Sequence, residues 1–470
     1  MNELTRKIAR NLTISVVGRF LSGALGIASV AFATRALGVS VFGEYNLVLT
    51  ILYIFSVFGS FGLDPLLTRE IAKEGADEKE TIERIFFARC ALLSVFLLLG
   101  VALVFFAPYS FNVKLGVALA AAGSFFFSLA QVFVGVFQRH LKTIIPAVAE
   151  VAVRGVQLTL SFYLYLVGGG IFEFLFVFVL GGTLYFIIAY YWVVVRTGFR
   201  FRMATEGFWD VLKEGWPLAV SAVLTLVYFR GDTVILSLMH SSRDVGIYGV
   251  AYKVLEHAIF IPIAFAGLVM PLLSRYAASD PARFRSVFQK AFDFLAIIAL
   301  PFAVGGAYLS QGIVHILAGD GFGGAAAPLR ILFVAIVFIF FGALFGNAIV
   351  ALHKQKAALW GYGAAALLNT AANLYFIKQY SYMGAAAVTA VTEVFVTLFL
   401  FFLVWRTLRF FPSMRVLGKA LGASGAMFLV LYFYPTQSFV ALLFSGACSY
   451  AALIYLFKGV SKNDLLFLKQ

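Results

Sequence analysis

The sequence is short of charge, cysteine and histidine, and each shortage excludes a class of protein. Only 12% of the 470 residues are charged, whereas 62% are hydrophobic. A soluble globular domain is about one quarter charged and about half apolar, so the main solvent of this chain is lipid. The 2 cysteines and 5 histidines are scattered without metal-ligand spacing, and the sequence therefore predicts no metal and no other cofactor.

Long loops are also missing. The segments between apolar runs reach at most about twenty residues, too few for a folded catalytic domain on either side of a membrane. A membrane-embedded glycosyltransferase or polymerase needs a large external loop and an acidic metal-binding motif, and because neither is present we expect no enzyme. The net charge of +14 comes from short basic clusters instead of one basic patch, which argues against a nucleic-acid partner.

Fourteen apolar runs are long enough to cross a membrane. Crossing about 30 Å of hydrocarbon takes roughly 20 residues of α-helix, and a helix satisfies the backbone polar groups of such a run internally. The sequence predicts an all-α polytopic membrane protein with spans at about 12–34, 44–63, 86–107, 114–137, 144–167, 172–195, 216–238, 246–270, 291–310, 328–351, 357–377, 383–405, 416–434 and 437–457.

Lys and Arg are concentrated in alternate loops. One set of loops holds most of them, whereas the opposite set holds only Arg35, Lys114, Arg243, Arg330 and Lys378. Because basic loops are retained on the cytoplasmic side, this alternation predicts a multi-pass protein of the cell membrane with both termini in the cytoplasm.

Three short patterns occur twice along the chain in the same order. The matched segments are Asp-Pro-Leu-Leu-Thr-Arg at 64–69 and Met-Pro-Leu-Leu-Ser-Arg at 270–275, Gly-Glu-Tyr at 43–45 and Gly-Ile-Tyr at 246–248, and Val-Phe-Gln-Arg at 136–139 and Ala-Leu-His-Lys at 351–354. The offset corresponds to six spans, an even number, so both copies enter the membrane in the same orientation. We predict an N-lobe at 1–200, a C-lobe at 201–410 and two additional C-terminal helices at 411–470.

The first part of the chain carries a recognisable signature. Ala-Thr-Arg-Ala-Leu-Gly at 33–38, Phe-Gly-Glu-Tyr at 42–45, Gly-Leu at 62–63 and Thr-Arg-Glu-Ile-Ala at 68–72 are similar to the amino-terminal signature of the polysaccharide flippase family, which includes O-antigen translocases. That family is part of the multidrug/oligosaccharidyl-lipid/polysaccharide exporter superfamily. The motif match covers roughly the first ninety residues, and the length, span count and duplication of the rest agree with it.

The resemblance implies a fold and a substrate. It implies two six-helix lobes in a V that open alternately to cytoplasm and exterior. The implied substrate is a glycan on an undecaprenyl or dolichol pyrophosphate, received by cationic side chains in a central cavity. The last two helices resemble those of the lipid II flippase branch, where they contact the lipid tail, and no catalytic residue is implied.

Basic side chains inside the predicted spans are candidates for substrate binding. A charged group at membrane depth is costly unless it faces a wet cavity or a partner, and a guanidinium presents a donor fork that matches phosphate oxygens. The candidates are Arg19, Arg230 and Lys253, on the leading helices of the two predicted lobes, followed by Arg154.

Acidic side chains at similar depth are candidates for ion coupling. Asp232, Glu256 and Glu393 could bind Na⁺ or a proton and couple a gradient to reorientation, and the membrane potential acting on the basic residues is an alternative driver. Local pairing is the competing interpretation at two places, because Glu150 is four residues before Arg154 and Glu256 is three residues after Lys253.

These observations together predict an alternating-access flippase that moves a lipid-pyrophosphate-linked oligosaccharide or a related anionic polysaccharide precursor. Its partners would be that lipid-linked glycan, the surrounding membrane lipids and a coupling Na⁺ or H⁺, and we expect a monomer. The alternative is a multidrug exporter of the same fold coupled to a Na⁺ or H⁺ gradient. Cationic drugs would favour an acidic cavity, whereas both predicted lobes carry bases. A purely structural scaffold is disfavoured by the buried charge and the duplication.

Overall fold

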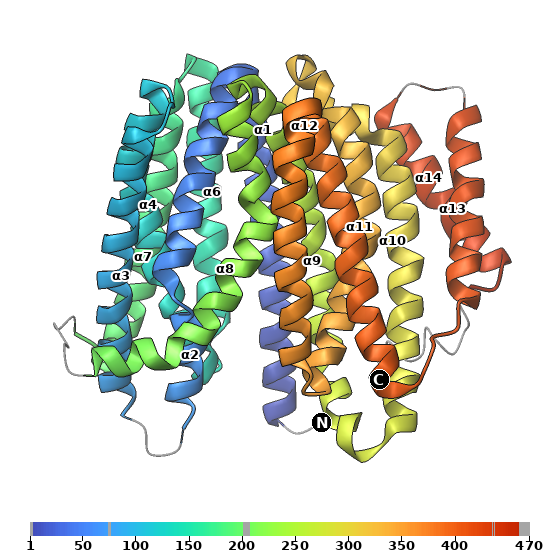
Figure 1. The fold of residues 1–470 in the computed structure, drawn as a ribbon, viewed down its shortest axis with the longest axis horizontal. Helices are drawn as coiled ribbons and strands as arrows, with labels where there is room; N and C mark the ends of the chain where they lie inside the picture. Colours follow the sequence, from blue (N-terminus) through green and yellow to red (C-terminus); the bar gives the residue numbers. More distant parts are fainter. Residues whose placement is uncertain (1–2, 74–76, 201–206, 435, 437, 460–470) are drawn as a thin grey trace. The chain divides into compact units, whose positions relative to one another are not determined.

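The computed structural model describes residues 3–73, 77–200, 207–434, 436 and 438–459, without the side chains of 3–16, 217, 221 and 228. This described part is α-helical with short connections and no strand (Figure 1). The chain divides into two compact units, Met1–Gly246 and Ile247–Gln470, here called unit 1 and unit 2. The lobe boundaries proposed from the repeat, at 200 and 410, stay predictions.

Two very long helices each contain two membrane spans. In the described chain, eleven helices are long and apolar enough to cross a membrane, or twelve if the bent pair in α8 counts as one span. Among them, α1 (Glu3–Ser60) and α12 (Gln355–Leu408) have 58 and 54 residues, far more than about 30 Å of hydrocarbon requires. Gly38, with φ 69°, and Ser381, with φ 50°, interrupt them. Dividing both helices there gives the fourteen spans that the sequence predicts.

Unit 1 is built on a helical bundle around α1. Its further helices are α2 (Leu63–Ile71), α3 (Glu78–Phe106), α4 (Phe111–Val132), α5 (Val134–Arg139), α6 (Ile144–Val167), α7 (Ile171–Thr197), α8 (Phe208–Met239) and the first turn of α9 (Ser242–Ser279). The short helices α2 and α5 were not predicted as separate elements: α2 begins where predicted span 44–63 ends, and α5 overlaps the end of predicted span 114–137. Figure 1 shows α2 at the lower end of unit 1, where the first turns of α8 also cross.

An aromatic core fixes this lower end. Phe86 of α3, Phe133 between α4 and α5, and Phe199 after α7 are all at most 3% exposed. Their ring centroids lie 5.2 to 5.8 Å apart. Lipid competes well for apolar side chains, so close packing of this kind, more than burial from water, holds membrane helices together. The core therefore sets the positions of α2 and α5.

Unit 2 contains most of α9, then α10 (Pro281–Ala318), a 3₁₀ turn η1 (Asp320–Ala325), α11 (Ala326–Ala351), α12, α13 (Arg415–Phe433) and α14 (Phe439–Leu456). The last two helices pack on α10. The Tyr450 hydroxyl of α14 donates to the Ile297 carbonyl at 2.7 Å, and the Tyr308 hydroxyl of α10 donates to the Leu431 carbonyl of α13 at 2.9 Å. These bonds satisfy polar groups where water is scarce.

Glycines form a close crossing between α1 and the start of α9, within unit 1. A Cβ on Gly43 would lie 1.8 Å from the Ser242 carbonyl oxygen, and a Cβ on Gly246 would lie 2.2 Å from the Val39 carbonyl oxygen. Val39 and Ser242 have the same sequence offset as Gly43 and Gly246, which are equivalent positions of the repeat. The contact is therefore reciprocal, as expected where two copies of one segment meet on a twofold axis.

We expect Gly43→Ala to lower stability by about 1–3 kcal/mol, because the added methyl must displace a backbone carbonyl. Gly26→Ala is the matched control on the same helix, where an added Cβ meets nothing within 4 Å. It should be neutral or stabilising by up to about 1 kcal/mol, because Ala is the better helix former. Thermal unfolding of the detergent-solubilised variants tests this, and equal midpoints for the two would contradict the crossing.

Candidate functional site

The structure places Arg19 on the face where α1 meets α6. Arg19 itself is exposed, whereas the adjacent Gly18 packs so closely that an added Cβ would lie 3.0 Å from the Ala147 Cβ of α6. The charges of Arg19 and of Glu150, on α6, both act on the Tyr185 hydroxyl of α7. Arg19 and Glu150 thus share one electrostatic environment on neighbouring helices.

Arg154 lies one turn further along α6 and is half-buried. Its Nη1 donates to Gln157 Oε1 at 3.1 Å, and its charge acts on Tyr45 of α1. The competing interpretation, a local ion pair with Glu150, does not hold in this structure: within the described residues Arg154 and Glu150 make no salt bridge, and Arg154 contacts Gln157. The Gln157 side-chain oxygen at i+3 accepts the guanidinium hydrogen bond instead, so Arg154 does not neutralise the charge of Glu150 along α6.

Arg230 is held against α1 from a third helix. The Arg230 guanidinium lies over the Tyr53 ring, 5.4 Å from its centroid, a distance at which the ring quadrupole attracts a cation. Arg230 follows closely on a bend of 47° between Leu218–Val227 and Phe229–Met239 of α8. Three predicted substrate-binding residues, Arg19, Arg154 and Arg230, therefore lie on α1 or on helices that contact it.

Asp232 is buried two residues beyond Arg230. Only 2% of it is exposed, and its Oδ1 accepts hydrogen bonds from the backbone N–H and the hydroxyl of Thr233, at 2.6 and 3.3 Å. A carboxylate at this depth is expensive unless it is hydrogen-bonded or binds a cation. Its placement fits the ion-coupling role predicted for it, which stays a prediction.

In unit 2, Lys253 pairs with Glu256. Their Nζ and Oε2 atoms are 2.9 Å apart, and each side chain is 22% exposed. This local pair at i, i+3 confirms the competing interpretation for these two residues. In this conformation the Lys253 charge is compensated, so a substrate phosphate would have to draw Lys253 away from Glu256.

Glu393 lies on α12 beside a buried network of neutral amides. It is 5% exposed. Asn369 donates to Thr392 Oγ1 at 3.0 Å, and Asn373 donates to Asn369 Oδ1 at 2.9 Å. Sequence reasoning missed both asparagines because it searched for ionisable residues only. Two amides four residues apart in an apolar span were a usable signal, since each must find a partner inside the protein.

A second missed group is Arg89 of α3, which is only 2% exposed. Its Nη2 donates to Ser128 Oγ at 3.0 Å and to the Ser128 carbonyl at 3.2 Å, and reaches Asp64 Oδ2 at 3.4 Å. Arg89 stands near the start of the predicted span 86–107, where an arginine ordinarily extends to the interface. Asp64, at the end of the preceding span, was the signal that a buried partner was available.

Next to this pair lies a cavity of about 470 Å³. It is formed by α2, the end of α4 and α5, and is lined by Asp64, Pro65, Thr68, Arg69, Gln131, Val134, Gly135 and Gln138. Arg69 is bound by two carboxylates, Glu214 at 2.7 Å and Glu70 at 2.9 Å. We refer to this space below as the α2 cavity.

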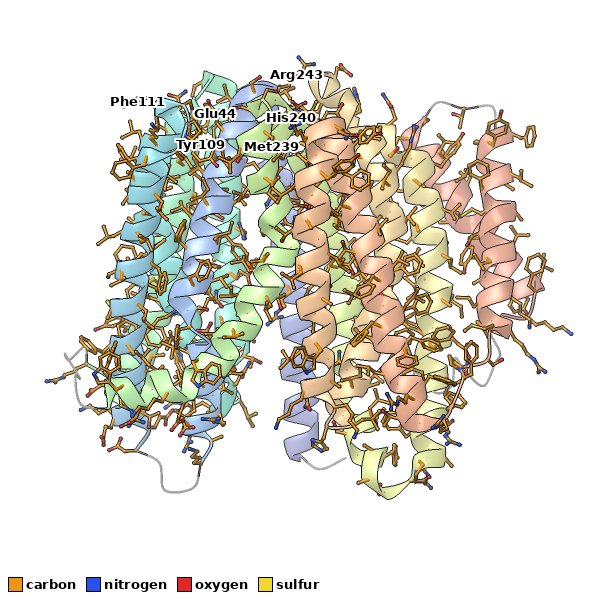
Figure 2. All side chains as sticks on the ribbon, viewed as in Figure 1. Glu44, Tyr109, Phe111, Met239, His240 and Arg243 are labelled. Atoms are coloured by element: carbon orange, nitrogen blue, oxygen red, sulfur yellow. The ribbon has the colours of Figure 1, made fainter. Side chains whose placement is uncertain are left out.

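The signature residue Glu44 serves the opposite end of unit 1 (Figure 2). Its carboxylate accepts hydrogen bonds from Ser110 Oγ at 2.7 Å and Asn112 Nδ2 at 3.2 Å, which anchors the α3–α4 connection to α1. The Tyr109 hydroxyl of that connection lies 3.0 Å from Ser237 Oγ of α8. Burial raises the pKa of Tyr109 against the opposing effect of this hydrogen bond, so the hydroxyl stays neutral at physiological pH.

Comparison with known proteins gives a consistent picture. The model of the polysaccharide biosynthesis protein family matches residues 8–277, and the MatE model matches residues 217–375. No curated protein matches the sequence. Among solved structures, the lipid II flippase MurJ in an inward closed conformation is similar, with a TM-score of 0.79 and 16% identity over 95% of this chain and 98% of that one.

Two transporters of the same superfamily are also similar. One is a multidrug resistance MATE family transporter in an inward-facing conformation, with a TM-score of 0.64 and 14% identity over 83% of this chain and 95% of that one. The other is a MOP superfamily transporter from Pyrococcus furiosus, with a TM-score of 0.62 and 14% identity over 86% and 96%. At such identities the likeness establishes the fold alone, a multi-pass helical membrane fold shared with these three proteins.

We expect Arg89→Met to destabilise the protein by about 3 kcal/mol, because it leaves Asp64 without its cation. This value is at the low end for buried pairs, since the Asp64 side chain is 39% exposed. Adding Asp64→Asn should recover most of the loss. Arg69→Met is the control, because exposed pairs contribute about 0–1 kcal/mol. Unfolding midpoints are measured for the three variants and the wild type, and a double variant no more stable than Arg89→Met would refute the pairing.

Proposed function

Because the chain belongs to the polysaccharide biosynthesis protein family, we propose that it is an alternating-access flippase for a lipid-pyrophosphate-linked oligosaccharide or a related anionic polysaccharide precursor. The observation that carries this proposal is the placement of Arg19 on α1 and of Arg154 and Arg230 on two helices packed against α1. A flippase performs no covalent chemistry, so its task is to stabilise a charged head group while that group crosses the membrane.

Guanidinium groups suit that task. A pyrophosphate offers several non-bridging oxygens on two tetrahedral phosphorus atoms, and the planar arginine fork binds two of them at once. Arg154 donates to a neutral amide and Arg230 lies over an aromatic ring, whereas Lys253 pairs with a carboxylate. We assign the pyrophosphate to the arginines first and to Lys253 after its release from Glu256.

We further propose that the buried acids couple an ion gradient to reorientation. Asp232 and Glu393 are 2% and 5% exposed, and a carboxylate at such depth gains most by binding Na⁺ or H⁺. Glu256 joins them if Lys253 moves to the substrate. The positive-inside pattern supports cytoplasmic termini, and we propose that the protein works as a monomer among membrane lipids.

A multidrug exporter of the same fold is the second candidate function. The MatE match over residues 217–375 and the two buried acids favour it, since carboxylates attract cationic drugs. The arginines of unit 1 would repel such substrates. Transport of a cationic dye that depends on Asp232 and Glu393, without transport of any lipid-linked glycan, would select this candidate.

Substitution of the proposed phosphate-binding residues tests the flippase. In proteoliposomes, Arg19→Ala, Arg154→Ala, Arg230→Ala and Lys253→Ala should each slow translocation of a lipid-pyrophosphate-linked glycan about tenfold or more, the effect of losing one charge-assisted hydrogen bond. Arg283→Ala is the control, because Arg283 is exposed and pairs with Asp280 on α10. Unchanged rates in all four variants would remove the cationic role while leaving the topology intact.

Neutralisation of the buried acids tests ion coupling. Asp232→Asn, Glu256→Gln and Glu393→Gln should abolish the acceleration of translocation by an imposed Na⁺ or H⁺ gradient, because the amide no longer binds the ion. Asp320→Asn, at a side chain that is 92% exposed, should keep it. If every variant responds to the gradient as the wild type does, the carboxylates are not the coupling groups, and the membrane potential becomes the driver.

A further inference from the structure

The α2 cavity has more hydrogen-bonding capacity than the protein itself uses. Its volume of about 470 Å³ lies within the range of about 300 to 1,000 Å³ that is usual for small-molecule sites. Gln131 is half-buried and Gln138 is exposed, and neither side-chain amide has a hydrogen-bond partner among the described residues. Asp64 Oδ1 is buried and also lacks one there. Buried polar atoms are rarely left so, which points to a ligand or to water.

The polar lining is held in a fixed geometry. Arg89, which is 2% exposed, is itself fixed by two hydrogen bonds to Ser128 and restrains the other carboxylate oxygen of Asp64. Thr68 Oγ1 donates to the Asp64 carbonyl at 3.1 Å. An added Cβ on Gly135 would lie 2.6 Å from Thr68 Oγ1, so α5 forms a wall directly against α2. Ligand groups on packed helices of this kind are pre-positioned.

The charges around the cavity cancel locally. Asp64 is compensated by Arg89, and Arg69 is compensated by Glu70 and Glu214. No excess positive charge is left for a pyrophosphate, which needs one. What stays available are two amides, each of which donates and accepts, and one carboxylate oxygen. This set matches a neutral polyhydroxyl compound, because each sugar hydroxyl also donates and accepts.

The duplication provides an internal comparison. The second copy keeps Pro-Leu-Leu-Ser-Arg at 271–275 inside α9 but has Met270 in place of Asp64 and His353 in place of Gln138. A helix therefore runs through the pattern without the polar side chains. Asp64 and Gln138 are therefore not needed to build this turn, and Asp64 Oδ1, the oxygen that Arg89 does not contact, is available to a ligand.

We propose that the α2 cavity is a sugar subsite, in which Asp64, Gln131 and Gln138 bind hydroxyl groups of the glycan part of the substrate. That this sugar is attached to a lipid pyrophosphate rests on the proposed flippase function. The pyrophosphate stays with the arginines on and around α1. Positive-inside reasoning places the α2 end of unit 1, with Arg69 and Arg139, on the cytoplasmic side, where a glycan arrives before translocation.

Direct sugar binding is the first test. Saturation-transfer NMR is recorded on the full chain, in a detergent without a sugar head group, with glucose, galactose and N-acetylglucosamine at millimolar concentration. At least one sugar should bind the wild type. Gln131→Ala and Gln138→Ala should each weaken that binding about five- to tenfold, the effect of losing one or two hydrogen bonds, with unchanged unfolding midpoints. Gln355→Ala, an exposed glutamine at the corresponding end of the second copy, should leave it unchanged.

Three results would overturn the subsite. The first is the absence of any sugar signal in the wild type, as expected if the cavity holds water only. The second is a signal that persists in both glutamine variants. The third is displacement of the sugar by inorganic pyrophosphate, which would show an anion site.

A translocation assay distinguishes failure of the sugar subsite from failure of the proposed flippase function. In proteoliposomes, Gln131→Ala should raise the half-saturating concentration of the lipid-linked glycan about five- to tenfold at an unchanged maximal rate, because it weakens binding only. Sugar binding lost in Gln131→Ala with unaltered translocation would show that the cavity is no part of the substrate path. Translocation by the wild type without sugar binding overturns the subsite alone, whereas sugar binding without any translocation overturns the flippase.

Discussion

The scarcity of water inside a bilayer governs the whole structure. Every backbone and side-chain polar group in a span must be satisfied by the protein itself or face an aqueous space. Helices satisfy the backbone groups through their own hydrogen bonds. Polar side chains in the spans are satisfied in several ways. Arg230 lies over an aromatic ring, Lys253 pairs with a carboxylate, two amides of α12 bond to each other, and a serine accepts hydrogen bonds from Arg89. Each of these contacts fixes one helix against another, or one turn against the next.

The helical fold was largely predictable because the spans follow from local sequence. The apolar runs fix the spans, and the breaks at Gly38 and Ser381 fall in the gaps left between predicted spans. The short helices α2 and α5 were missed because hydropathy does not register a helix of 9 or 6 residues. Their presence depends on packing against the aromatic core around Phe133, which brings together segments far apart in the sequence.

The candidate site was predictable only in part. Spacing along one helix predicted the Lys253–Glu256 pair correctly but failed for Glu150 and Arg154, because a competing amide at Gln157 lies within the same reach. Arg89 was invisible to this reasoning, since its partners Asp64 and Ser128 lie on other helices. Whether a charged side chain meets a partner across helices depends on tertiary packing, which no periodicity in a single sequence reveals.

The glycine crossing has an evolutionary consequence. When a gene segment duplicates in parallel, a residue on the symmetry axis comes to face its own copy, so the original segment must tolerate self-contact. Val39, Gly43, Ser242 and Gly246 meet in this reciprocal way. A side chain at either glycine would meet the backbone carbonyl of the facing segment, at Ser242 or Val39, whereas glycine leaves that space free. A backbone-only crossing of this kind tolerates two identical segments before either has diverged, and leaves each segment free afterwards to acquire its own polar chemistry.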